Sequence, residues 1–120
     1  MHVLAHTPLV HQRLGGELSL VAVDRSRGVD GFEVWVHTLD ALAQTAERQH
    51  GGELVVLVLA GGGKLLIDGS PQRFNAPCTL LIPPNAPFQL VNNGAATMQL
   101  VWVFTESPIA VSSTPERTTP

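Results

Sequence analysis

Two residues suited to acid–base chemistry or metal binding, His50 and Glu53, flank the dipeptide Gly51-Gly52. Glycine readily adopts the positive φ that two-residue hairpin loops require, so the dipeptide predicts a tight turn. Residues that flank such a turn oppose each other and point to the same face of the sheet. We therefore predict that His50 acts as a general base assisted by Glu53. A solvent-exposed hairpin tip with two polar side chains is the competing interpretation.

A further histidine lies in residues 31–38, GFEVWVHT, where side chains alternate as in a half-buried β-strand. One face carries the apolar residues at positions 32, 34 and 36, and the other carries Glu33, Trp35 and His37. If the apolar face packs in the core, Glu33 and His37 lie in solvent. If the strand lines a ligand cavity, Trp35 and His37 are candidate ligand contacts. The alternation leaves both arrangements open.

Histidine and carboxylate side chains can also hold a metal ion. A site built from His50 and Glu53 with His37 as a third ligand is one such arrangement. The remaining histidines within residues 1–16 lie in a segment without clear periodicity, which we interpret as a solvated arm rather than a metal-binding tract. They are His2, His6 and His11.

Composition limits the classes of function. A chain of 120 residues with 44% hydrophobic content predicts one domain with one core. The net charge of −3 and the seven scattered Lys and Arg residues argue against a nucleic acid or an anionic membrane as partner. The apolar run 54–60 is too short to span a bilayer. The single cysteine, Cys78, and an N-terminus unlike a signal peptide predict a cytoplasmic protein.

Short apolar runs between turn signals fill the central part of the chain and predict an all-β sandwich or barrel. Residues 1–16 form an N-terminal arm or edge strand, residues 17–105 form the barrel, and residues 106–120 form a flexible tail rich in Ser, Thr and Pro. The segment 40–48, DALAQTAER, has helical propensity, yet its place between strands is also compatible with an irregular strand.

Two stretches, ELVVLVLAGGGKLLIDG at 53–69 and PCTLLIPPNAPFQLVNN at 77–93, resemble the cupin family together with the apolar strand that follows. The resemblance covers about residues 32–105 and implies a double-stranded β-helix, the jelly-roll barrel of that family. Pro83, Asn85 and Asn92 are in register with the second cupin motif. Pro77 stands where that motif begins with glycine, and Phe88 stands where it has a histidine.

The first cupin motif is similarly degenerate. Alignment on Gly61 places Leu54 at the motif's glutamate, His50 at its second histidine and Arg48 at its first. In metal-binding cupins these positions supply ligands, whereas leucine and phenylalanine have no lone pair to donate. The resemblance therefore implies a barrel without the full set of metal ligands, and we expect no cofactor. The alternative is a divalent transition metal held by His37, His50 and Glu53.

We carry two hypotheses of function. The first is that the barrel binds a small-molecule ligand in an apolar cavity, with the two tryptophans either stacking on the ligand or packing as core. The predicted ligand-binding residues are Trp35, His37, Arg48, Leu54, Phe88, Gln89 and Trp102.

The second hypothesis is a cupin-type enzyme, an isomerase, lyase or dioxygenase, as the resemblance implies. His50 would be its base, assisted by Glu53 or His37, while Arg48 and Gln89 would orient an anionic or carbonyl substrate. We also predict a homodimer, because residues 53–59 and 99–104 are apolar on both faces of their strands.

Overall fold

The computed structural model describes residues 3–105 and 110–111, and the predicted tail otherwise lies outside these residues. The described chain is almost entirely β-structure apart from one short 3₁₀ helix at Arg25–Arg27. No helix in this part of the chain is long and apolar enough to cross a membrane. The strands are β1 (Gln12–Leu14), β2 (Glu17–Val23), β3 (Phe32–Leu39), β4 (Arg48–Gln49), β5 (Leu54–Ala60), β6 (Gly62–Ile67), β7 (Ser70–Asn75), β8 (Cys78–Ile82), β9 (Phe88–Asn92), β10 (Met98–Thr105) and β11 (Ala110–Val111).

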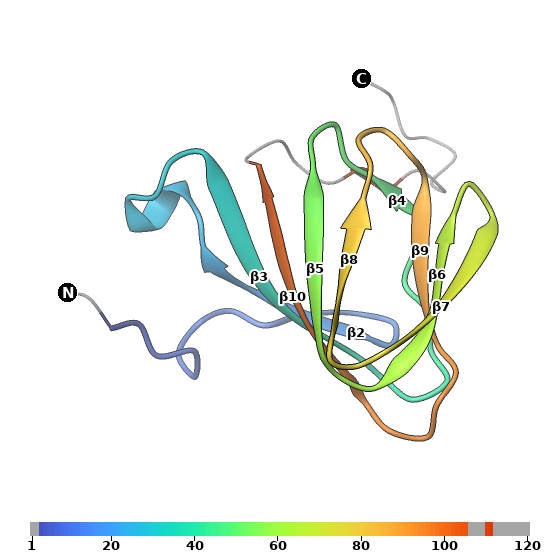
Figure 1. Ribbon diagram of the computed structural model, residues 1–120. Coiled ribbons are helices and arrows are strands. Elements are labelled where there is room, and N and C mark those ends of the chain that lie inside the picture. Colours follow the sequence, from blue (N-terminus) through green and yellow to red (C-terminus); the bar gives the residue numbers. More distant parts are fainter. Residues whose placement is uncertain (1–2, 106–109, 112–120) are drawn as a thin grey trace.

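The strands form two antiparallel sheets that face each other around one core (Figure 1). One sheet has the order β1-β2-β3-β10-β5-β8, and the other has the order β11-β4-β9-β6-β7. The chain changes sheet after β3, β4, β5, β7, β8, β9 and β10, so neither sheet is built from consecutive strands alone. Two facing antiparallel sheets connected in this way form a jelly-roll barrel, which confirms the predicted all-β fold.

The core lies between the sheets and is made of the alternate residues that each strand points inward. In β10 these inward residues are Met98, Leu100, Trp102 and Phe104, all of which are buried. The neighbouring strand β5 contributes the buried Leu54, Val56 and Val58. Alternation of side chains across a strand explains this pattern directly.

In β3 the face with Trp35 and His37 is the inward one. His37 and Leu39 are buried, and Trp35 packs against the core. On the other face, Phe32 is 44% exposed. Of the two arrangements that the alternation left open, the structure has the one in which His37 faces the interior of the barrel.

Residues 40–47 form an extended connection and contain no helix. The middle of this segment pairs with β9 through its backbone: Thr45 N donates to Leu90 O at 2.9 Å, and Asn92 N donates to Ala43 O at 2.9 Å. Leu42 adopts a φ of 61°, in the left-handed region. Hydrogen bonds to a distant strand thus override the local helical propensity.

The predicted hairpin at Gly51-Gly52 is wrong. The strand before it, β4, pairs with β9 and β11 in one sheet, whereas β5 after it pairs with β10 and β8 in the other. The glycines therefore connect two sheets rather than two paired strands, and His50 and Glu53 do not oppose each other. His50 is buried at 2% exposure, while Glu53 is exposed.

Candidate functional site

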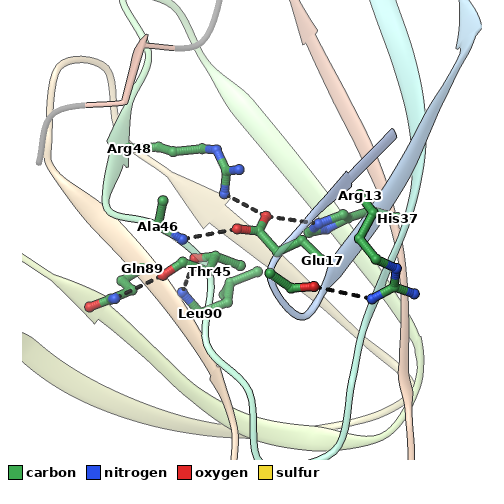
Figure 2. A network of polar contacts seen from close by, with 9 residues as sticks. Arg13, Glu17, His37, Thr45, Ala46, Arg48, Gln89 and Leu90 are labelled. Atoms are coloured by element: carbon green, nitrogen blue, oxygen red, sulfur yellow. Dashed lines mark hydrogen bonds and ion pairs between the residues drawn. The ribbon is translucent and has the colours of Figure 1, made fainter. Parts of the chain in front are cut away.

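A buried carboxylate, that of Glu17 at the start of β2, has three polar partners from different parts of the chain (Figure 2). Its Oε1 atom lies 3.0 Å from Nε2 of His37 and 2.8 Å from Nη1 of Arg48. Its Oε2 atom accepts a hydrogen bond from the backbone N–H of Ala46 at 3.0 Å. We call Glu17, His37 and Arg48 the Glu17 cluster.

Three strands position the cluster. In the pairing of β2 with β3, Glu17 is opposite Leu39 and Ser19 is opposite His37, so Glu17 and His37 are diagonal neighbours on the same face. Arg48 belongs to β4 in the other sheet. The extended connection before β4 brings the amide of Ala46 to the carboxylate. The cluster thus joins the two sheets of the barrel by polar contacts.

Glu17 is held in its ionised form. Burial by itself would raise the pKa of this carboxyl group, but the hydrogen bonds from His37 and Arg48, the positive charge of Arg48 and the Ala46 amide together lower it below its ordinary value. An ionised carboxylate only accepts hydrogen bonds, so the Nε2 atom of His37 must be the donor. In the neutral imidazole, Nδ1 is then the nitrogen with a free lone pair.

Tryptophan rings form the walls around the cluster. The ring of Trp102 meets the His37 ring edge to face, with 5.0 Å between centroids. The guanidinium carbon of Arg48 lies 5.8 Å from the centre of the same indole, within the range of a cation–π contact. Trp35 packs against Phe104 at 5.3 Å and donates from Nε1 to Glu33 Oε1 at 2.9 Å. Aromatic and charged groups therefore meet at the same place.

The barrel is hollowed at this cluster. A small, partly open cavity has about 20 Å³ of room for the centre of a water molecule, and it is lined by Glu17, Ser19, Trp35, His37, Arg48 and Trp102. An open depression of about 540 Å³ lies against it, lined by Gln12, Arg13, Leu14, Glu17, Ser19, Trp35 and Arg48. Four residues belong to both linings: Glu17, Ser19, Trp35 and Arg48. The small cavity is thus the floor of the depression.

The structure brings together four of the predicted site residues: Trp35, His37, Arg48 and Trp102. The sequence analysis missed Glu17, the centre of the cluster. Glu17 directly follows Gly15-Gly16 at the start of an alternating strand. At such a position a glutamate is ordinarily expected to be exposed to solvent. Alternation along residues 17–23 places Glu17 on the same strand face as Ser19. That pattern could have identified Glu17 as a site residue only if this face had been known to point inward.

The other predicted residues lie elsewhere. Leu54 and Phe88 are each 1% exposed and belong to the hydrophobic core, so this part of the interior is packed with side chains rather than open as an apolar cavity. Gln89 donates from Nε2 to the Thr45 carbonyl oxygen at 2.8 Å and so fastens the connection before β4 (Figure 2). His50 packs against Phe104 at 5.1 Å, with its Nε2 atom 3.3 Å from Thr105 Oγ1.

The donor set does not fit the metal centre that many cupins have. No group of three or more His, Cys, Asp or Glu side chains within the described residues is placed to hold a metal ion. The alternative site of His37, His50 and Glu53 is not assembled, since Glu53 is exposed and the two histidines are buried. Leu54 and Phe88 have no donor atoms at the motif positions.

Comparison with known proteins places this architecture in a family. The family model described as "Cupin domain" matches residues 35–104, more than half of the chain. Auxin-binding protein 1 of Arabidopsis thaliana is 29% identical over 93 residues. That match covers 70% of this chain and 47% of the plant protein, so the chain spans about half the length of this relative.

Solved structures share the fold at low sequence identity. The polyketide cyclase RemF from Streptomyces resistomycificus is 18% identical, with a TM-score of 0.80 over 97% of this chain and 88% of the cyclase. A salicylate 1,2-dioxygenase from Pseudaminobacter salicylatoxidans is also 18% identical, with a TM-score of 0.73 over 84% of this chain and 32% of the enzyme.

The names of these two enzymes describe different reactions, so the fold does not specify the chemistry of this chain. The family assignment rests on sequence rather than on shared fold, because the cupin model matches the sequence from the middle of β3 nearly to the end of β10. Those strands supply both sheets of the jelly roll and two of the three residues of the Glu17 cluster. The chain belongs to the cupin family.

Proposed function

We propose that this cupin binds a small organic molecule in the depression above the Glu17 cluster. The observation that carries the proposal is the combination of an open hollow of about 540 Å³ with two charged side chains at its floor, the buried Glu17 and the half-buried Arg48. Ligand pockets typically have volumes of about 300–1,000 Å³, with a few fixed polar groups among apolar walls. Trp35 and Leu14 supply apolar surface, and Arg48 and Glu17 supply fixed polar groups.

This proposal modifies the predicted apolar cavity. The expected lining residues Leu54 and Phe88 are core, whereas the hollow part of the barrel has a polar floor. A ligand that binds here would place an apolar or aromatic part against Trp35 and a polar group toward Arg48 and His37. The small-molecule partner predicted from the sequence is retained, and its binding surface moves from the centre of the barrel to the side bounded by β1, β2, β3 and β4.

A fragment screen by ligand-observed NMR tests the proposal with a matched pair of variants. In Ser19→Phe a large ring fills the depression, because Ser19 lines it. In Leu18→Phe the same ring is added on the opposite face of the same strand. We expect fragments that bind the natural chain to lose binding in S19F and to keep it in L18F. If S19F binds the same fragments with unchanged affinity, the depression is not the binding site.

His37 supports a second candidate, an enzyme that moves a proton on its substrate, such as an isomerase or lyase. His37 lines the floor cavity, and its buried Nδ1 atom makes no hydrogen bond with any described residue. Such a nitrogen can accept a proton from a substrate C–H bond while the electron pair stays on the substrate, and the nearby Glu17 carboxylate would stabilise the imidazolium. Return of the proton to a neighbouring carbon would complete an isomerisation.

The base of the predicted enzyme is therefore proposed to be His37 rather than His50 with Glu53. Incubation with a panel of enolisable ketones in D₂O, followed by ¹H NMR, tests this assignment. We expect deuterium incorporation that is lost in His37→Gln and retained in His11→Gln, a substitution at an exposed histidine. Equal exchange by both variants, or exchange no faster than in buffer, would contradict the assignment.

A further inference from the structure

Two buried nitrogen atoms at the floor of the depression make no hydrogen bond with any described residue: His37 Nδ1 and Trp102 Nε1. Their side chains belong to residues that are 3% and 2% exposed. Buried polar atoms in proteins are nearly always hydrogen-bonded, and leaving one unsatisfied is costly. Both residues line the same small cavity. The two unsatisfied atoms therefore indicate a group that binds between them.

The size of the cavity limits this group to one small atom with its hydrogens. A cavity needs about 10–15 Å³ of space for the centre of a water molecule in order to hold one. The cavity beside His37 and Trp102 has about 20 Å³. It also has polar walls, which a stable buried water requires. A single oxygen atom fits this space.

The two nitrogens require complementary properties of that oxygen. The indole Nε1–H of Trp102 is only a donor, so the oxygen must accept from it. The Nε2–H of His37 points at the Glu17 carboxylate, 3.0 Å away, so in the neutral form of the ring Nδ1 is an acceptor. The oxygen must therefore also donate. Water and hydroxyl groups do both, whereas carbonyl, ether and carboxylate oxygens cannot donate.

We propose that this cavity is a hydroxyl-binding subsite, occupied by water in the free protein and by a hydroxyl group of the ligand in the complex. Access is available because the cavity shares Glu17, Ser19, Trp35 and Arg48 with the open depression. The indoles of Trp35 and Trp102 offer apolar surface beside it, which favours a planar ring next to the hydroxyl group. The ligand class is thus a phenol or an enol. The ligand part of this inference rests on the proposed function.

The water part is tested without any ligand. A crystal structure of the full chain at atomic resolution is expected to show one ordered oxygen within about 3.2 Å of both His37 Nδ1 and Trp102 Nε1. Long-range ¹H–¹⁵N NMR spectra are expected to show His37 as the tautomer protonated at Nε2. An empty cavity, an oxygen that contacts only one of the two nitrogens, or a proton on His37 Nδ1 would overturn the subsite.

The ligand part is tested with two probes of nearly the same shape, phenol and anisole. Anisole carries a methyl group in place of the hydroxyl hydrogen, so it cannot donate to His37. We expect phenol to bind the natural chain about tenfold more tightly in an NMR titration. In Trp102→Phe both probes should bind more weakly, because the oxygen of either one would accept from the indole N–H that is lost, and in L18F the preference for phenol should persist.

The outcomes separate the two proposals. Equal affinity for phenol and anisole would overturn the hydroxyl subsite. So would a lack of phenol binding when other fragments bind the natural chain but not S19F. In both cases the proposed binding site stands. If no fragment of the screen binds the depression, the proposed function fails and the ligand part of this inference falls with it. The crystal structure still decides the water part in that case, even if W102F does not fold.

Discussion

The carboxylate of Glu17 lies 3.0 Å from Nε2 of His37, although the two residues are 20 positions apart in the chain. Both are nearly inaccessible to solvent, with side chains 5% and 4% exposed. Arg48 completes the cluster from the opposite sheet. This single carboxylate therefore connects three strands, orients the histidine and compensates the charge of a half-buried arginine.

Replacement of Glu17 by glutamine should destabilise the protein. The amide keeps the shape of the side chain but leaves the Arg48 guanidinium, whose side chain is 12% exposed, without its counter-charge. Removal of one partner from a buried ion pair costs about 3 kcal/mol of unfolding free energy. Urea denaturation measures this loss. Glu53→Gln is the control, because Glu53 is exposed and its change should alter stability by less than about 0.5 kcal/mol.

The difference in unfolding free energy between the natural chain and E17Q should depend on pH. The pKa of Glu17 is lower in the folded protein than its ordinary value of 4.5, so the folded state binds this proton less readily than the unfolded chain does. The contribution to stability is present above the unfolded pKa and is lost as pH falls through the lower folded pKa. Urea unfolding of the natural chain and E17Q should therefore converge as pH falls below about 4.5. A constant stability difference from neutral to acidic pH would contradict this assignment.

Asn92 should be important for stability rather than for ligand binding. Its side-chain amide donates to the carbonyl oxygens of Leu39, Asp40 and Ala96 at 3.0, 3.1 and 2.9 Å, and its Oδ1 accepts from Gly94 N at 3.0 Å. Asn92→Ala removes the partner of one buried and two partly buried carbonyl groups and should cost about 2–4 kcal/mol. Thermal and urea unfolding measure the loss.

The neighbouring asparagine provides the control for this change. Asn93 is exposed, and Asn93→Ala should have little effect on stability. Equal stability of N92A and N93A would show that the hydrogen bonds of Asn92 do not hold the loop to β9.

The predicted homodimer has a specific candidate surface. On the outer face of the six-stranded sheet, Leu57, Leu59 and Leu81 are 37%, 57% and 72% exposed. Neighbouring strands β5 and β8 carry these leucines. Burial of such residues against a second copy would remove apolar surface from water. We expect a dimer by size-exclusion chromatography with light scattering, and a monomer when Leu59 and Leu81 are both replaced by glutamate.

A matched substitution separates this effect from a general change of charge. Leu42 is 79% exposed but lies in the connection before β4, away from this surface. Leu42→Glu should leave the dimer intact. A natural chain that is monomeric at micromolar concentration would contradict the dimer prediction.

Local patterns in the sequence were sufficient for the architecture. Alternation in residues 31–38, turn residues at Gly61 and Asp68-Gly69, and the motif frame with Pro83 and Asn92 predicted a jelly-roll barrel of the cupin family, which the structure and the family model confirm. These signals are short-range, because a strand's alternation and a turn's backbone angles depend on neighbouring residues. Asn92 is an example: it occupies the position of the motif's asparagine, and its side chain donates hydrogen bonds to the carbonyl oxygens of Asp40 and Ala96 in the adjoining loops.

The sequence alone thus determined the strands and the family. It also identified His37, Arg48 and Trp102 as candidate site residues. Only the tertiary structure decided that the Trp35–His37 face of β3 points inward, that Gly51-Gly52 separates His50 and Glu53 into different environments, and that Glu17 joins His37 to Arg48. The physical reason is that alternation specifies two faces but not which of them is buried. That choice, like the pairing of strands distant in sequence, is made by contacts across the whole barrel.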